Sequence, residues 1–184
     1  MNCDYPMVSI VVVNARGTVN LRRCLNSLFE TEYSNFEVIV VDCLTHGIEE
    51  MLKSEFPKAR IVHLDYDCGP AEQHNIGYRM SDPESKYIAF LDNDTEVTSG
   101  WLINLLTTLN SDETVGVLQP KLLFLNSKKR IDGSGDFMDY VGNTYSRGRF
   151  EIDLGQYDSK PEIFSARGAA FITIKALDLW DFIL

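Results

Sequence analysis

The chain has 184 residues, of which 45% are hydrophobic and 24% are charged, and its formal net charge is −10 at pH 7. This composition is typical of a globular domain that can form a core without disulfides or a structural metal. The acidic balance excludes a protein that binds nucleic acid through clustered Lys and Arg, so no nucleic-acid partner is expected. The four cysteines lie far apart without a Cys-x-x-Cys pair, which favours free thiols in a reducing compartment.

Predicted strands and helices alternate along the first half of the chain. Nearly continuous apolar runs predict strands that are covered on both faces, at Val8–Val13, Phe36–Val41, Ile61–Leu64 and Tyr87–Leu91. Apolar residues at helical spacing predict helices between and after them, at 21–29, 48–52, 70–80 and from 101 onward, the last with Ser99 as its N-cap. This alternation predicts an α/β fold, with a Rossmann-like, mostly parallel sheet flanked by helices.

The second half of the chain has a different residue pattern. Further strands are expected at 115–118 and 122–125. From about Lys128 onward, glycines interrupt aromatic residues without a helical period, which predicts hairpins and loops laid over the sheet. A returning strand is expected within 164–174, passing through Gly168.

Polar side chains stand at the ends of the predicted strands. Asn14 follows the first strand, Asp42 the second, the pair Asp65 and Asp67 the third, and Asp92 the fourth. Ligands of open parallel sheets bind beyond the carboxyl ends of the strands, so these residues are candidates for a binding site. A turn or a helix cap is the simpler role for Asp65, because Asp commonly serves there.

The segment Asp92-Asn93-Asp94 is the most specific local signal. In an extended backbone, side chains at i and i+2 point to one side, roughly 6–7 Å apart, so the two carboxylates are expected to share a divalent ion. Oxygen ligands favour Mg²⁺ or Mn²⁺ with positions open for substrate phosphates. An EF-hand loop is excluded because Val97 stands where that loop needs Gly.

Other phosphate-binding devices are absent from the sequence. The residues after the first strand contain no G-x-G-x-x-G, which argues against a dinucleotide-binding fold. No G-x-x-x-x-G-K-[ST] occurs, which removes the P-loop class. A metal held by Asp92 and Asp94 would neutralise a phosphate ligand in place of a glycine cradle.

The order of these segments resembles the inverting family 2 of glycosyltransferases, which have the GT-A fold. The matching segments are Val8–Asn14, Phe36–Asp42, Gly69-Pro70-Ala71 with Asn75-Ile76-Gly77, Asp92-Asn93-Asp94 at the place of the family's D-x-D, and Gly168-Ala169-Ala170. Two further segments, 116–121 and 147–155, are similar to its rhamnosyltransferase-like branch.

The resemblance implies one GT-A domain over 1–184, with a nucleotide-sugar-binding half at 1–97 and a partial, glycine-rich acceptor-side half at 98–184. It implies transfer of a sugar, with inversion, from a UDP, dTDP or GDP donor to a saccharide or lipid-linked saccharide, in cell-surface polysaccharide or glycan synthesis. The implied donor-binding residues are Asn14, Asp42 (at the base), Gly69, Asn75, Asp92 and Asn93, and the implied ligands of Mn²⁺ or Mg²⁺ are Asp92 and Asp94.

The chain departs from the family at three places. Ala15 replaces an aromatic residue, and Cys43-Leu44-Thr45 replaces Asn-x-Ser. The family's catalytic base is expected beyond Leu184, since Asp178 and Asp181 stand too close to the Gly-Ala strand. A nucleotidyltransferase and a non-catalytic nucleotide-binding module are the alternatives. With no apolar run of membrane-spanning length and no signal peptide, the expected location is cytoplasmic, including the inner face of the membrane.

Overall fold

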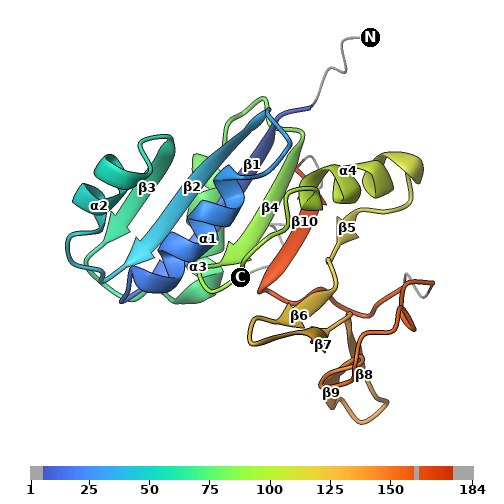
Figure 1. Ribbon diagram of the computed structural model, residues 1–184. Coiled ribbons are helices and arrows are strands. Elements are labelled where there is room, and N and C mark those ends of the chain that lie inside the picture. Colours follow the sequence, from blue (N-terminus) through green and yellow to red (C-terminus); the bar gives the residue numbers. More distant parts are fainter. Residues whose placement is uncertain (1–5, 160–161, 176–184) are drawn as a thin grey trace.

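A computed structural model describes residues 6–159 and 162–175. Asp178 and Asp181 lie outside the described residues. The helices and strands follow one another in the order shown in Figure 1. Their bounds are β1 Val8–Ala15, α1 Val19–Phe29, β2 Phe36–Cys43, α2 Ile48–Glu55, β3 Ala59–Leu64, α3 Gly69–Met80, β4 Tyr87–Asp92, α4 Trp101–Ser111, β5 Val117–Leu118, β6 Leu122–Phe124, β7 Ser127–Gly133, β8 Asp136–Met138, β9 Thr144–Ser146 and β10 Ala170–Ile174.

The central sheet has the strand order β3-β2-β1-β4-β10-β5. Strands β1 to β4 are mutually parallel, as their alternation with helices predicts. Strand β10 runs antiparallel to both β4 and β5, so the chain passes through β6 to β9 before it returns to the sheet. The α/β fold with a mostly parallel sheet is thereby confirmed.

Both faces of the sheet are covered by helices (Figure 1). Val8, Ile10 and Val12 of β1 belong to the core that α1, α2 and α4 close. Val11 and Val13 point to the opposite face, where α3 covers a second core. Alternate residues of one strand thus enter different cores, which explains why β1 is apolar at nearly every position.

Helix α3 approaches the sheet closely at Gly77. A Cβ atom at this position would lie 2.2 Å from Cγ1 and 2.8 Å from Cγ2 of Val11. The absence of a side chain at Gly77 therefore sets how near α3 lies to β1, and with it the position of the helix relative to the strand ends.

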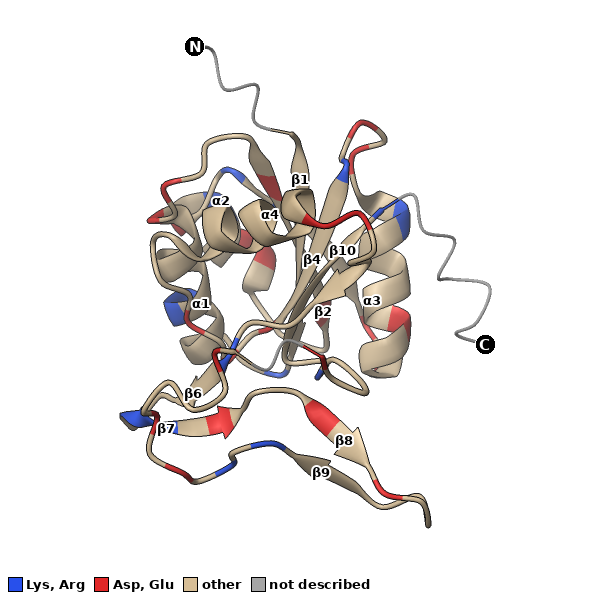
Figure 2. Cartoon of the chain, turned by 90° about the vertical axis from the view of Figure 1, so that its right-hand side faces the viewer, with Lys and Arg blue, Asp and Glu red and all other residues tan. Residues whose placement is uncertain are grey.

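The hairpins formed by β6–β7 and β8–β9 lie beyond one end of the sheet (Figure 2). The β8–β9 hairpin confirms that a hairpin follows Lys128, but it lies beyond the end of the sheet and not over its face, as was expected. Two local expectations were wrong. Only 170–174 of the expected strand over 164–174 is extended in the sheet. Helix α4 has Gly100 rather than Ser99 at its N-cap, and the carbonyl of Ser99 instead accepts a hydrogen bond from the Glu32 amide.

Among the described residues, none of the helices combines the length and the apolar character needed to cross a membrane.

Candidate active site

The parallel register brings the polar strand ends to one edge of the sheet. Asn14 of β1 pairs with Asp42 of β2, Asp42 pairs with His63 of β3, and Val13 pairs with Asp92 of β4. Because these strands all run in one direction, their carboxyl ends meet at this edge. Residues that are tens of positions apart in sequence are therefore neighbours here.

Asp42 and Asn14 are the buried centre of this edge. Asp42 is 0% exposed and Asn14 is 2% exposed. The Asn14 side-chain amide donates to Asp42 Oδ1, to Thr45 Oγ1 at 3.2 Å and to the Gly17 carbonyl at 3.0 Å. The other Asp42 oxygen, Oδ2, accepts from the Thr45 backbone amide at 3.1 Å and contacts His63 Nδ1 at 2.7 Å. A buried carboxylate is stable only with such partners.

Asn93 joins this network to the end of β4. Its side-chain amide donates to Asn14 Oδ1, and its backbone amide donates to the Val13 carbonyl at 3.1 Å. The structure thus brings together Asn14, Asp42 and Asn93, three of the residues for which the family resemblance implies donor binding.

The Asp92-Asn93-Asp94 segment departs from the extended geometry expected for it. Asp92 ends β4, whereas Asn93 and Asp94 form a turn that is closed by a hydrogen bond of 3.1 Å from the Thr95 amide to the Asp92 carbonyl. The alternation of an extended strand therefore does not place the two carboxylates on one side. Their proximity arises from the turn, which Asn and Asp favour.

The two carboxylates still interact electrostatically. The pKa of Asp92 is raised, first by burial of its carboxyl group and second by the charge of Asp94, while the Arg167 guanidinium opposes the shift. A cation beside the pair would relieve both effects that raise this pKa. Within the described part of the chain, no group of three or more His, Cys, Asp or Glu side chains is placed to hold a metal ion. Two carboxylates can hold a divalent ion only where substrate phosphates and water complete its coordination, which is the usual case for Mg²⁺.

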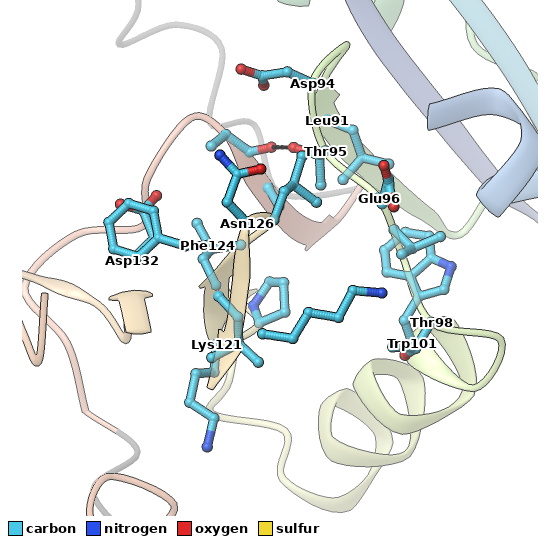
Figure 3. Close-up of a pocket in the computed structure, with 18 residues that line it drawn as sticks. Leu91, Asp94, Thr95, Glu96, Thr98, Trp101, Lys121, Phe124, Asn126 and Asp132 are labelled. Atoms are coloured by element: carbon cyan, nitrogen blue, oxygen red, sulfur yellow. Dashed lines mark hydrogen bonds between the residues drawn. The ribbon is translucent and has the colours of Figure 1, made fainter. Parts of the chain in front are cut away.

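A pocket of about 510 Å³ opens beside Asp94. Figure 3 shows Leu91, Glu96 and Trp101 along one side and Phe124 and Asp132 along the other. Ala169 and Ala170 also line it, and the Ala169 carbonyl accepts hydrogen bonds from the Asp92 amide at 3.0 Å and from Thr95 Oγ1 at 3.1 Å. Ala169, directly before β10, therefore lies beside the acidic turn.

Gly69 and Asn75 lie on helix α3, which follows β3. Gly69 is its first residue, with a φ of +75°, and its amide donates to Asp67 Oδ1 at 3.1 Å. Asp67 therefore has the turn role that Asp commonly fills. Asn75 stands six residues further along, about 9 Å at the rise of an α-helix, and its amide contacts Glu72 Oε2 at 3.3 Å. The structure does not bring Asn75 into the Asn14–Asp42 network, and its role in donor binding stays a prediction.

Three residues of the hydrogen-bond network around Asn14 and Asp42 were not expected as site residues, namely Thr45, Gln73 and His63. Thr45 stands three positions after Asp42, a spacing typical of a turn capped by Asp, so its amide contact could have been expected. Gln73 is 4% exposed and donates from α3 to the carbonyls of Asn14 at 2.7 Å and Val41 at 2.9 Å. Neither Gln73 nor His63 had a sequence signal, because both contacts depend on how β3 and α3 pack beside β2.

The sheet topology, the helices on both faces and the acidic turn after β4 define a domain of the GT-A class. Solved structures of this class superpose on most of the chain. TarS 1-349 of S. aureus has a TM-score of 0.61 at 17% identity and covers 92% of this chain, which in turn covers 47% of it. GalNAc-T7, solved with UDP, GalNAc and Mn²⁺, has a TM-score of 0.68 at 14% identity, with 95% of this chain and 36% of that chain covered.

The chain belongs to glycosyltransferase family 2. The family model described as Glycosyl transferase family 2 matches residues 8–171. An uncharacterized glycosyltransferase of Rickettsia bellii is 26% identical over 144 residues, which is 74% of this chain and 19% of that protein. One of Haemophilus influenzae is 33% identical over 89 residues, which is 48% of this chain and 29% of that protein. The chain therefore spans less than a third of either relative.

Proposed function

We propose that this chain contains the donor-binding site of an inverting glycosyltransferase, which transfers a sugar from a nucleoside diphosphate to an acceptor hydroxyl in the synthesis of cell-surface polysaccharide or another glycan. The observation that carries the proposal is the acidic turn Asp92-Asn93-Asp94, which stands at the sheet edge where the pocket opens. Two solved relatives of the fold support a nucleotide-sugar donor. TarS 1-349 has been solved with UDP-GlcNAc, and a mannosyltransferase of Pyrobaculum calidifontis with GDP-Man and Mn²⁺.

In this proposal Asp92 and Asp94 hold Mn²⁺ or Mg²⁺ together with the donor diphosphate. The raised pKa of Asp92 supports a cation at this place, because the burial and the neighbouring Asp94 charge that raise it are both offset by a positive ion. When bound, the metal supplies Lewis-acid stabilisation of the leaving diphosphate.

The remaining donor residues would orient the ligand at the same edge. Asn14 and Asn93 join the ends of β1 and β4 through their side chains, so a nucleotide that spans these strands would meet a preorganised surface. Gly69 and Asn75 on α3 stay in the proposed donor-binding set. The pocket between the acidic turn and the β6–β7 hairpin would take the acceptor, a saccharide or a lipid-linked saccharide.

A cytoplasmic location, including the inner face of a membrane, is part of the proposal. It is supported by the cysteines, which lie far apart in the sequence without a Cys-x-x-Cys pair, as is typical of free thiols in a reducing compartment.

Isothermal calorimetry on the full chain tests the metal and the donor together. We expect UDP, dTDP or GDP to bind at least tenfold more tightly with Mn²⁺ or Mg²⁺ than with EDTA, and Asp94→Ala to abolish this difference. Glu113→Ala is the matched control, since Glu113 is an exposed acid after α4 and should leave the metal effect unchanged. Equal affinity with and without metal would refute the metal-dependent site.

A further inference from the structure

Two cysteine side chains from separate elements meet at the end of β2. Cys43 is the last residue of β2, and Cys68 directly precedes the first residue of α3. Although they are 25 positions apart in the sequence, their Sγ atoms lie 3.5 Å apart, so one thiol can donate a hydrogen bond to the other. Both are free thiols, and neither is assigned to donor or metal binding.

Solvent reaches the two thiols unequally. Cys43 is 0% exposed, whereas Cys68 is only partly buried. Cys68 Sγ also lies 3.7 Å from the Gly69 carbonyl, which places it at the start of α3. A reagent in solution therefore meets Cys68 first and can reach Cys43 only through it.

The loop between β3 and α3 carries Cys68 and is exposed. Tyr66 in this loop is 59% exposed, and Asp67 forms an exposed ion pair with Arg16 at 3.1 Å. Exposed ion pairs of this kind contribute little to stability. A bond between the two sulfurs needs a separation of about 2.0 Å, so they must approach by roughly 1.5 Å. Movement of this loop can bring Cys68 to Cys43 while the core stays in place.

We propose that Cys43 and Cys68 form a reversible disulfide when the surrounding pool of low-molecular-weight thiols becomes oxidised, and that this bond fixes the start of α3 to the end of β2. Disulfides in cytosolic proteins are usually transient and redox-sensing, so such a bond is compatible with the reducing compartment proposed above. It forms within the chain itself and does not depend on whether the chain binds a nucleotide sugar.

The oxidant is a small disulfide of the glutathione type. The Cys68 thiol loses its proton, and the thiolate attacks one sulfur of the oxidant, which forms a mixed disulfide and releases one glutathione thiolate. The Cys43 thiol then loses its proton and attacks Cys68 Sγ, which releases the second glutathione thiolate. Both leaving thiolates take up the two protons. Two protein thiols are thereby oxidised to one disulfide, and one oxidised glutathione is reduced to two glutathione thiols.

The environment of Cys68 favours the second step over the first. Burial and the hydrogen bond with Cys43 raise the pKa of Cys68 to about 11. Because the thiolate is the attacking species, Cys68 reacts slowly with reagents in solution at neutral pH. The attack of Cys43 is intramolecular and starts from a separation of 3.5 Å, so it is fast by comparison. The mixed disulfide therefore does not accumulate while Cys43 is present.

The disulfide would change how α3 is held. Gln73 already joins the helix to the strand ends by two hydrogen bonds, and the disulfide adds a covalent link before the first turn. It also closes a loop that contains α2 and β3, which restricts the unfolded chain. We expect the urea midpoint of the oxidised protein to lie roughly 1 M above that of the reduced protein, and amide hydrogens in the first turn of α3 to exchange more slowly.

Mass spectrometry of the folded full chain, equilibrated with glutathione at about pH 8.5 to speed thiol exchange, tests the bond. In excess oxidised glutathione we expect the wild type to lose the mass of two hydrogen atoms and the peptides that contain Cys43 and Cys68 to be recovered joined. Excess reduced glutathione should restore both thiols. Cys3→Ser combined with Cys24→Ala is the control, because it keeps the pair and should behave as the wild type.

Single variants separate the roles of the two thiols. Cys43→Ser should accumulate a glutathione adduct on Cys68, because the second attacking thiol is missing. Cys68→Ser should stay unmodified at Cys43, which is 0% exposed, and an adduct there would overturn the order of the two steps. Circular dichroism checks that each protein is folded before oxidation. A folded wild type that keeps all its thiols, carries a stable glutathione on Cys68 or joins other cysteines would overturn the proposal.

Discussion

Gln73 provides the sharpest test of how helix α3 is held against the site. Its side chain is 4% exposed, and its single amide group donates to the carbonyls of Asn14 and Val41, at the ends of two neighbouring strands. Gln73→Leu keeps a similar volume but leaves both carbonyls without this donor. A buried acceptor that loses its partner costs about 1–3 kcal/mol, so we expect a loss of about 2–4 kcal/mol in the free energy of unfolding.

Gln73→Glu tests the same contact by replacing the amide donor with a carboxylate. A carboxylate cannot donate to the two carbonyls and carries a charge into a buried position, so this variant should be less stable than Gln73→Leu at pH 7. Burial raises the folded-state pKa of the introduced acid above its unfolded value of about 4.3. The unfolding free energy of this variant should therefore recover as the pH falls through the folded-state pKa.

Urea denaturation followed by circular dichroism measures these differences. Ala71→Leu is the control, because Ala71 is exposed on the same helix and its substitution should change the unfolding free energy by less than about 0.5 kcal/mol. An unchanged m-value would show that the variants alter stability rather than the extent of unfolding. If the unfolding free energy of Gln73→Leu lies within about 0.5 kcal/mol of the wild-type value, the two hydrogen bonds of Gln73 do not hold α3 to the strand ends.

Packing and titration at the α3 face of the sheet yield two more predictions. Gly77→Ala places a methyl group 2.2 Å from Val11 Cγ1 and should lower the unfolding free energy by about 1–3 kcal/mol. Val11→Ala removes the clashing methyl groups, so the loss in the double variant should be smaller than the sum of the two single losses. A loss equal to that sum would contradict the clash. Burial lowers the pKa of His74. Its Nε2 has no hydrogen-bond partner, and its ring centroid lies 5.0 Å from that of Phe90. The unfolded chain therefore takes up this proton first, and stability should fall as the pH drops below about 6.5. His74→Phe should remove that part of the pH dependence in urea midpoints at pH 7.5 and 5.5, and an identical slope in both proteins would refute it.

The sequence by itself determined the sheet, the helices and the position of the acidic turn. Nearly continuous apolar runs at β1, β2 and β4 encode strands that are buried on both faces, and the apolar stripe of α1 encodes a helix packed on them. These signals are local, because strand and helix periods appear within one segment. Asn14 and Asp42 were predictable as candidate site residues for the same reason, since each directly follows an apolar run in the sequence.

The tertiary structure alone decided which of these residues meet and what they offer to a ligand. The parallel register placed His63 beside Asp42, and the packing of α3 through Gly77 brought Gln73 to the strand ends. The turn at Asn93 replaced the extended geometry that the spacing of Asp92 and Asp94 suggested. Hydrogen-bond partners of buried polar groups come from distant segments, so their identity follows from strand order and helix position rather than from any local pattern.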